Sequence, residues 1–347
     1  MISPAPKKIS IEKFLKLAEQ YPVADVRSPA EYNHGHIPGA VNIPLFDDRE
    51  RKSVGLTYNK SGRIRSIIRG LELTGHSMHS KLSKALKIAR QGKILVHCWR
   101  GGMRSEAMAW LFALGDLDVE ILEGGYKSYR NYILKKLSEK QQMIILGGMT
   151  GSSKTQILHY LKGQNHQVID LEGLANHRGS AFGSLGQPPQ PSSEYFANML
   201  FDEWKLTDKA LPVWVEDESR NIGNVFLPDT FFNNMQEAPA VILLMDLKTR
   251  LPGLIKEYSA YPPDLLKSNI TKISKRLGLE NAREAINAIE SGDFASAIEI
   301  ILRYYDKTYM FSIKQKRFGE VLYVNTDVDD VEANTLKILE VIRKITW

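Results

Sequence analysis

The sequence predicts two α/β domains in tandem, the second of which carries a helical insertion. A length of 347 residues corresponds to about two domains at roughly 100–200 residues each. Short β-rich runs alternate with helical patterns in both halves, which indicates parallel sheets covered by helices. Beyond Pro252 helical patterns rich in Lys and Arg replace this alternation. We therefore expect one domain over residues 1–125, a linker helix over 126–140, and a second domain over 141–347 with a basic helical insertion at about 252–318.

The composition is that of a globular protein, with 43% hydrophobic and 25% charged residues and a net charge of +6. It excludes a disordered chain, a collagen-like chain and a small disulfide scaffold. The single cysteine, Cys98, excludes an intrachain disulfide and a multi-cysteine zinc site, which favours a reducing compartment. The N-terminal residues have no apolar run after their charges, and the longest apolar stretches, 107–114 and 238–245, are far shorter than the ~20 residues that span a bilayer. We expect a cytoplasmic protein, whose modest basic excess permits a polyanionic partner without requiring one.

The elements follow from short β-rich runs and from apolar residues at helical spacing. In the first domain we expect strands over 23–26, 40–43, 93–97 and 119–122, and helices over 11–20, 78–90 and 104–114. In the second domain we expect strands over 143–146, 167–170, 213–216, 241–245 and 321–325. Helices are expected over 265–277, 282–290, 295–316 and 331–345.

A lone cysteine in a strand-to-helix turn is the most specific local signal in the first half. A buried-strand pattern ends at Cys98, a loop with Gly101 and Gly102 follows, and a helix then begins. Loop amides and a helix N-terminus favour an anion, so the pKa of this thiol should be lowered, and Arg100 and Arg104 add positive charge. The pattern favours nucleophilic sulfur or a persulfide at Cys98 over a buried structural cysteine.

Three segments of the first half together resemble the rhodanese family. They are DVRSPAEY at 25–32, GHIPGAVNIP at 35–44, and the Cys98 loop. The resemblance implies a rhodanese-like α/β domain in which Cys98 carries sulfur or selenium, with Arg104 stabilising the anion and Arg100, Gly101 and Gly102 supporting the loop. From the residues themselves we expect Asp25 to pair with Arg27 at a strand end. His34 and His36 are expected to make structural hydrogen bonds rather than to bind a metal.

A phosphate-binding loop is predicted at the start of the second domain. After a buried-strand pattern comes GMTGSSKT at 148–155, which matches the P-loop pattern except that Ser153 replaces the glycine before the lysine. Backbone amides would hold phosphate oxygens, Lys154 would reach a terminal phosphate, and Thr155 could hold Mg²⁺. We expect Ser153 to adopt a right-handed helical backbone at the start of the helix. The predicted phosphate-binding residues are Gly148, Gly151, Ser152, Ser153, Lys154 and Thr155.

No metal ligand is assigned from the sequence. The acidic residues 216–218 and Asp246 each follow a predicted strand, and either group could hold a metal or cap a helix. The alternative for the whole segment 148–155 is a strand–helix turn with an incidental lysine, and the spacing favours phosphate binding over it. ATP hydrolysis and its absence remain equally compatible with the residues.

The order of the two domains, together with segments 171–183, 214–223, 273–278 and 304–307, resembles the tRNA 2-selenouridine synthase family. The resemblance implies a rhodanese-like domain followed by a P-loop NTPase-like parallel-sheet domain. It implies a tRNA substrate with 2-thiouridine at the wobble position, whose sulfur is replaced by selenium from selenophosphate. It also implies an S-geranyl intermediate made from geranyl diphosphate. No tightly bound cofactor is implied, and the P-loop need not use ATP.

The helical insertion offers a candidate tRNA surface. Basic side chains contact phosphates and aromatic rings can stack on unpaired bases, whereas a solvated helix face with core tyrosines is the alternative. From the residues alone the two interpretations are balanced, and the resemblance favours tRNA. The predicted tRNA-binding residues are Lys272, Lys275, Arg276, Arg303 and Tyr304, with Tyr305 and Tyr309 nearby. Arg178 is a further candidate anion contact.

Two other functions fit the same residues. The first is a P-loop nucleotide kinase or NTPase with a regulatory rhodanese module, and the second is a non-catalytic tRNA-binding scaffold. Substituting Cys98 separates a selenium transferase from a kinase, because only the transferase would lose its activity. The residues that would bind a geranyl chain are not identified, since Phe196, Met199 and Trp204 fit a hydrophobic core better.

Overall fold

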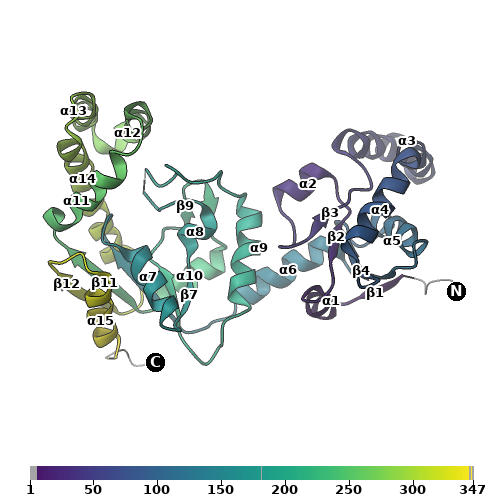
Figure 1. Ribbon diagram of the computed structural model, residues 1–347, viewed down its shortest axis with the longest axis horizontal. Helices are drawn as coiled ribbons and strands as arrows, with labels where there is room; N and C mark the ends of the chain where they lie inside the picture. The colour runs from purple at the N-terminus through teal and green to yellow at the C-terminus, as the bar shows by residue number, and fades with distance from the viewer. Residues whose placement is uncertain (1–5, 181, 344, 346–347) are drawn as a thin grey trace. The chain divides into compact units, whose positions relative to one another are not determined.

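The chain folds into two compact units, Met1–Lys136 and Leu137–Trp347 (Figure 1). The computed structural model describes residues 6–180, 182–343 and 345. Both units are α/β with a parallel sheet, which confirms the predicted fold class. In the described part of the chain, no helix combines the length and the apolar character needed to cross a membrane.

The first unit is built on a parallel five-stranded sheet in the order β1-β5-β4-β2-β3. Its strands are β1 (Lys7–Ile9), β2 (Val23–Asp25), β3 (Val41–Asn42), β4 (Lys93–His97) and β5 (Asp118–Leu122). The sequence predicted all of these except β1. That strand was missed because three residues, two of them exposed lysines, form an edge strand too short to show alternation.

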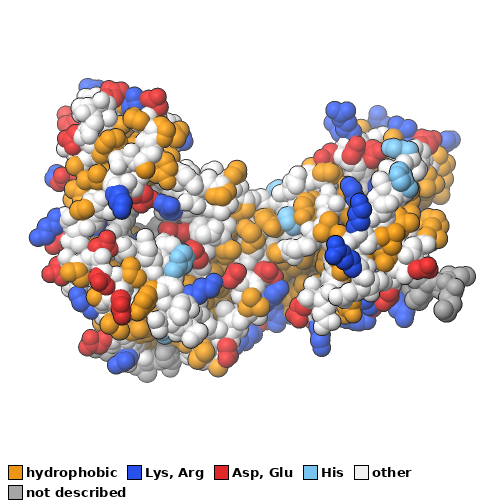
Figure 2. Space-filling view, viewed as in Figure 1, with side chains coloured by type: hydrophobic (Ala, Val, Ile, Leu, Met, Phe, Trp, Pro, Cys, Tyr) orange, Lys and Arg blue, Asp and Glu red, His pale blue; other side chains and the backbone are white. Residues whose placement is uncertain are grey.

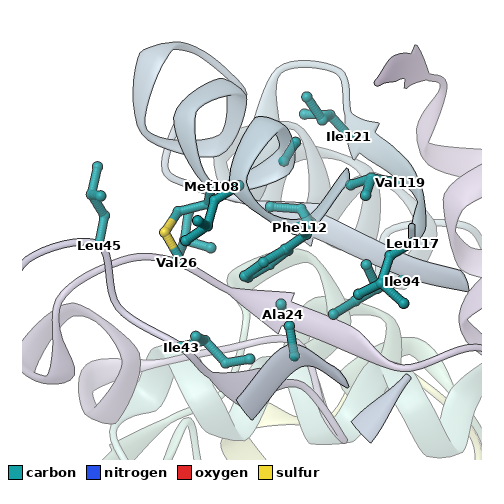
Figure 3. Packing of buried hydrophobic residues seen from close by; sticks show 14 of the residues in the cluster. Ala24, Val26, Ile43, Leu45, Ile94, Met108, Phe112, Leu117, Val119 and Ile121 are labelled. Atoms are coloured by element: carbon teal, nitrogen blue, oxygen red, sulfur yellow. The ribbon is translucent and has the colours of Figure 1, made fainter. Parts of the chain in front are cut away.

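Helices cover both faces of this sheet. They are α1 (Ile11–Ala18), α2 (Pro29–His34), α3 (Asp48–Thr74), the short 3₁₀ helix η1 (Gly75–Ser77), α4 (Met78–Ile88), α5 (Met103–Ala113) and α6 (Gly125–Leu137). On one face Ile94 and Val96 of β4 pack with Met108 and Phe112 of α5 (Figure 3). On the other face the His97 ring lies against Phe14 of α1 and Tyr126 of α6. Side chains that alternate along β4 thus supply both halves of the core.

Three helices of this unit differ from expectation, and the first is α2, a six-residue helix too short to show a helical period. The sequence did not predict α3, a 27-residue segment with a non-helical backbone at Gly62 in its interior, because its apolar residues do not follow one period. Figure 2 shows Lys and Arg side chains over this helix. Helix α6 was expected to be a linker with an exposed face, yet Tyr126, Tyr129 and Ile133 are buried along one side of it. It therefore contributes to the packing of the first unit rather than only connecting the units.

The second unit has a parallel sheet of five strands in the order β12-β11-β6-β8-β7. The strands are β6 (Met143–Gly148), β7 (Gln167–Ile169), β8 (Val213–Glu216), β11 (Ala240–Met245) and β12 (Val321–Thr326), and a separate antiparallel pair is formed by β9 (Asn221–Ile222) and β10 (Val225–Phe226). All five sheet strands match the sequence prediction to within two residues. The chain leaves the central strand β6 toward β7 and β8 on one side and later forms β11 and β12 on the other. Ligands bind at such a switch point, at the carboxyl ends of the strands.

The helices of the second unit divide into those that flank the sheet and those of the insertion. The flanking helices are α7 (Lys154–Gly163), α8 (Leu171–Ala175), α9 (Ser193–Trp204), α10 (Asp229–Glu237) and α15 (Val331–Ile342). The insertion between β11 and β12 consists of α11 (Leu247–Tyr258), α12 (Pro263–Leu277), α13 (Leu279–Glu290) and α14 (Phe294–Lys316). These four helices share an apolar core, to which Phe182 and Leu185 from the segment between α8 and α9 also contribute. Phe196 and Trp204 are buried in α9, as the core interpretation predicted.

Candidate functional site

Cys98 lies at the end of the central strand of the first unit. Its side chain is 3% exposed, and its Sγ is 3.3 Å from the hydroxyl oxygen of Ser105 in α5. The same hydroxyl is 2.9 Å from the carbonyl oxygen of Gly102. Because a hydroxyl carries one hydrogen, it can donate either to this carbonyl or to the sulfur. Ser105 is thus placed to stabilise a thiolate, and the sequence analysis did not single it out.

The loop lowers the pKa of the Cys98 thiol. Burial alone would raise this pKa, but the Ser105 hydroxyl, the charge of Arg104 and the backbone N–H groups of Arg100 and Ser105 together outweigh burial. The thiolate fraction at a given pH is therefore larger than in an ordinary cysteine, which favours nucleophilic or chalcogen-carrying chemistry.

The two arginines of the loop are placed differently. The guanidinium of Arg104 binds the carboxylate of Glu31 at 2.6 and 3.3 Å, so part of its charge is compensated. It acts on Cys98 through space, and no direct contact with the sulfur is formed among the described residues. Arg100 is exposed. Glu31 was not predicted, although it belongs to the rhodanese-like segment 25–32.

The turn Gly124–Gly125 supports the backbone of the cysteine loop. The carbonyl oxygen of Cys98 accepts a hydrogen bond from the N–H of Tyr126 at 2.8 Å, and that of Trp99 accepts one from Lys127 at 3.0 Å. At Gly125, where φ is +59°, a Cβ atom would lie 2.4 Å from the Cys98 carbonyl oxygen and 2.4 Å from the Gly101 nitrogen. Only glycine permits this approach. The sequence placed the end of the first domain at residue 125 but did not predict this role for the two glycines.

A buried ion pair holds the adjacent strand end. Arg27 binds Asp25 through several hydrogen bonds, the shortest 2.6 Å, and also donates to the Gly35 carbonyl oxygen at 2.6 Å. This confirms the predicted pairing. The Arg27 guanidinium lies 3.8 Å from the centre of the Tyr126 ring, which connects the pair to the residue that supports the cysteine loop. His36 Nδ1 lies 3.0 Å from the Tyr32 carbonyl oxygen, which is the structural hydrogen bond expected of this residue, and its ring stacks on that of Tyr32.

The predicted phosphate loop of the second unit lines a cavity of about 660 Å³ at the carboxyl end of β6. This volume lies within the range of about 300–1,000 Å³ that is usual for small-molecule sites. Its wall includes all six predicted phosphate-binding residues. The ammonium group of Lys154 donates to the carbonyl oxygen of Gly148, the first residue of the loop, at 2.8 Å. Arg178 also lines the cavity, and there it pairs with Glu257.

Ser153 does not have the right-handed helical backbone that the sequence analysis expected. Its φ and ψ are 58° and 25°, in the left-handed region. This conformation costs a residue with a Cβ atom about 1–2 kcal/mol, which explains why the P-loop pattern places glycine there. The Ser153 hydroxyl donates to Asp329 Oδ1 at 2.6 Å, a contact that fixes the strained residue.

Acidic side chains lie beside the loop. The hydroxyl of Thr155 donates to Glu172 Oε2 at 3.2 Å. Burial, and after it the neighbouring charge of Glu172, raises the pKa of Glu218 well above its usual range. Asp246 instead precedes α11 at its N-cap position. Among the described residues no three histidine, cysteine or acidic side chains are arranged to hold a metal ion by themselves.

Helices α14 and α11 of the insertion each contact the phosphate loop. Tyr309 receives a hydrogen bond from the Gly148 N–H at 2.7 Å and donates one to Asp217 at 2.9 Å. Asp306 binds Arg250, and this buried arginine donates to the Thr150 carbonyl oxygen at 2.8 Å. Tyr309 was expected near the tRNA surface, and the other two contacts were not predicted, because they join residues 100 and 56 positions apart.

The predicted tRNA-binding residues lie on two helices of the insertion. Lys272, Lys275 and Arg276 are exposed on α12. Arg303 is exposed on α14 and pairs with Glu299 at 2.7 Å, whereas Tyr304 is half-buried against the core of the insertion. Helix α13 packs against both α12 and α14. Because the four basic side chains are exposed, they are accessible to a polyanion. Tyr304 offers less ring surface for stacking than a fully exposed tyrosine would.

The fold and these two loops define a class of two-domain protein in which a rhodanese domain is followed by a P-loop domain of the AAA type. Residues 10–132 match the rhodanese-like domain family, and residues 141–337 match the family described as the tRNA 2-selenouridine synthase AAA domain. Curated relatives named tRNA 2-selenouridine synthase match along most of their length. The protein from Nitrosomonas europaea is 34% identical over 85% of this chain and 90% of its own, and that from Bdellovibrio bacteriovorus is 34% identical over 92% and 96%. The chain belongs to the tRNA 2-selenouridine synthase family.

Proposed function

We propose that this protein replaces the sulfur of 2-thiouridine at the wobble position of tRNA with selenium from selenophosphate. The name of the relatives supports the reaction, and their similarity extends over both domains. The observation that carries the proposal is the Cys98 loop, in which a hydroxyl and backbone amides lower the pKa of a thiol at a strand end. Such a loop is suited to holding an anionic chalcogen.

We propose that the exchange proceeds in two displacements. The thiocarbonyl sulfur first attacks C1 of geranyl diphosphate, so that a C–S bond forms, a C–O bond breaks and diphosphate leaves. Selenium at the selenide oxidation level then adds to C2 of the base, and the C2–S bond breaks to release geranyl thiol. The Se–P bond of selenophosphate is cleaved by water, and phosphate leaves. Neither displacement changes the overall oxidation state. Alkylation makes the exchange easier because a thiol leaves more readily than the sulfur of a thiocarbonyl group.

The residues of each loop support one of these displacements. Lys154 and the amides of residues 148–155 would stabilise departing diphosphate, since preorganised donors act where negative charge develops. Cys98 with the surrounding amides would hold or deliver the incoming selenium. The exposed basic side chains of α12 and α14 would bind the tRNA backbone.

The test is mass spectrometry of nucleosides from 2-thiouridine tRNA incubated with the protein, selenophosphate and geranyl diphosphate, each omitted in turn. We expect 2-selenouridine only in the complete mixture, and S-geranyl-2-thiouridine when selenophosphate is omitted. Cys98→Ala should abolish selenium incorporation while it preserves geranylation. Lys154→Ala should reduce both, whereas Lys162→Ala, an exposed lysine on the same helix, should reduce neither.

The alternative function, a P-loop nucleotide kinase or NTPase with a regulatory rhodanese module, predicts a different result. Phosphotransfer from ATP would then persist in Cys98→Ala, and no selenium- or geranyl-containing nucleoside would form. That outcome would overturn the proposed function.

A further inference from the structure

The cavity beside the phosphate loop has an apolar wall that the proposed steps do not use. Phe182, Leu254, Tyr258 and Tyr305 line the same cavity as the loop. Leu254 lies directly against the loop, because a Cβ atom at Gly151 would be 2.6 Å from its Cδ1. A ligand bound by the loop would therefore meet this wall next.

The apolar wall continues into the core of the insertion. A second, smaller cavity of about 10 Å³ is lined by Ile298, Ile301 and Leu302 of α14. It shares five lining residues with the large cavity, namely Thr150, Ser180, Phe182, Tyr258 and Tyr305. Its volume corresponds to about one water molecule, so it can take only the end of a chain.

The chemistry of this wall favours a hydrocarbon over a nucleobase. The eight described residues that line the small cavity carry no charge, and Phe182 and Tyr258 are 5% and 8% exposed within apolar packing. A base requires hydrogen-bond partners along its edge, and leaving them unsatisfied would cost affinity. A hydrocarbon chain requires only apolar surface, and its burial is favourable for every methylene group.

We propose that this wall, formed by Phe182, Leu254, Tyr258 and Tyr305, binds the isoprenoid chain of a diphosphate ester whose diphosphate lies in the phosphate loop. The inference rests on the proposed function and assigns the residues that select the geranyl group. The chain runs through the large cavity along the wall, and its end meets the small cavity between α11 and α14. The wall therefore sets the preferred chain length, while the loop binds the charged end of any such ester.

Calorimetric titration of the full chain with inorganic diphosphate, dimethylallyl diphosphate and geranyl diphosphate tests this assignment. We expect affinity to rise at least tenfold from the five-carbon to the ten-carbon ester. Phe182→Ala should lower geranyl diphosphate affinity at least tenfold and leave inorganic diphosphate within twofold. Leu302→Phe, which fills the small cavity, should weaken the geranyl ester more than the dimethylallyl ester. Leu265→Ala, at an exposed position on α12, is the matched control and should leave the affinities for all three diphosphates unchanged.

Three results would overturn the assignment. The first is equal affinity for all three diphosphates in the unmodified protein. The second is an equal loss of affinity for all three in Phe182→Ala. The third is ADP binding more tightly than geranyl diphosphate with the same loss in Phe182→Ala, which would make the wall a platform for a base. Chain-length-dependent binding without 2-selenouridine formation would refute the proposed function alone. Selenium incorporation without chain-length dependence would refute this assignment alone.

Discussion

The Tyr309 hydroxyl accepts a hydrogen bond from the backbone N–H of Gly148 at 2.7 Å, although the two residues are 161 positions apart. The same hydroxyl donates to Asp217 after β8, and Arg317 binds the other oxygen of that carboxylate. At Gly147 a Cβ atom would lie 2.4 Å from the Tyr309 oxygen, so the strand end and the tyrosine fit closely. One side chain of the insertion thus fixes the start of the phosphate loop.

We expect Tyr309→Phe to weaken inorganic diphosphate binding by about 5- to 150-fold. The substitution leaves the buried Gly148 N–H without its acceptor, which costs about 1–3 kcal/mol. Calorimetric titration measures the affinity, and urea unfolding shows whether the fold is kept. Tyr323→Phe removes the hydroxyl of an exposed tyrosine and should bind inorganic diphosphate with the same affinity as the unmodified protein. Unchanged affinity in a folded Tyr309→Phe protein would exclude a positioning role.

The pH dependence of Cys98 alkylation should report its environment directly, because this is the sole cysteine. Burial opposes ionisation, but the Ser105 hydroxyl, the Arg104 charge and the loop amides together lower the pKa of the thiol. The rate of reaction with iodoacetamide should therefore reach its plateau at a lower pH than the rate for a free cysteine thiol. Ser105→Ala removes a stabilising contact to the thiolate and should shift the midpoint to higher pH. Ser83→Ala, at an exposed serine on α4, should not shift it.

Gly125→Ala should disturb the cysteine loop much more than Gly92→Ala. Both glycines have positive φ, 59° and 74°, so both substitutions share the backbone cost of about 1–2 kcal/mol. Only at Gly125 would the new methyl group collide with backbone, whereas nothing lies within 4 Å of the corresponding position at Gly92. We expect an additional loss of at least about 1 kcal/mol in the free energy of unfolding for Gly125→Ala. Equal losses in urea unfolding would contradict the observed packing of this turn on the loop.

Asp25→Asn should lower the free energy of unfolding by about 3–5 kcal/mol. Arg27 and Asp25 are 1% and 0% exposed, so the substitution leaves a buried guanidinium without its carboxylate. Glu237→Gln breaks an exposed pair with Lys140 and should cost less than about 1 kcal/mol. Urea unfolding monitored separately in each unit compares the two. A similar small effect for both would show that the buried pair contributes little to stability.

The sequence predicted most of the sheet strands and both loops, because each depends on local pattern. The run before Cys98 and the P-loop segment 148–155 lie where expected, at the ends of buried parallel strands. The expectation for Ser153 was wrong because the backbone of the phosphate loop, rather than the preference of serine, sets its φ. Helix α3 was missed because exposed residues carry no strong periodic signal.

The sequence alone determined the two α/β domains, the lone thiol in an anion-favouring turn and the lysine of a phosphate loop, since residues adjacent in the chain specify these features. The tertiary structure decided which distant residues complete each site: Ser105 and Gly125 around the thiol, and Tyr309 and Arg250 around the phosphate loop. The physical reason is that a hydrogen bond or a close contact depends on distance in space. Residues separated by up to 161 positions reach that distance only when strands and helices pack together.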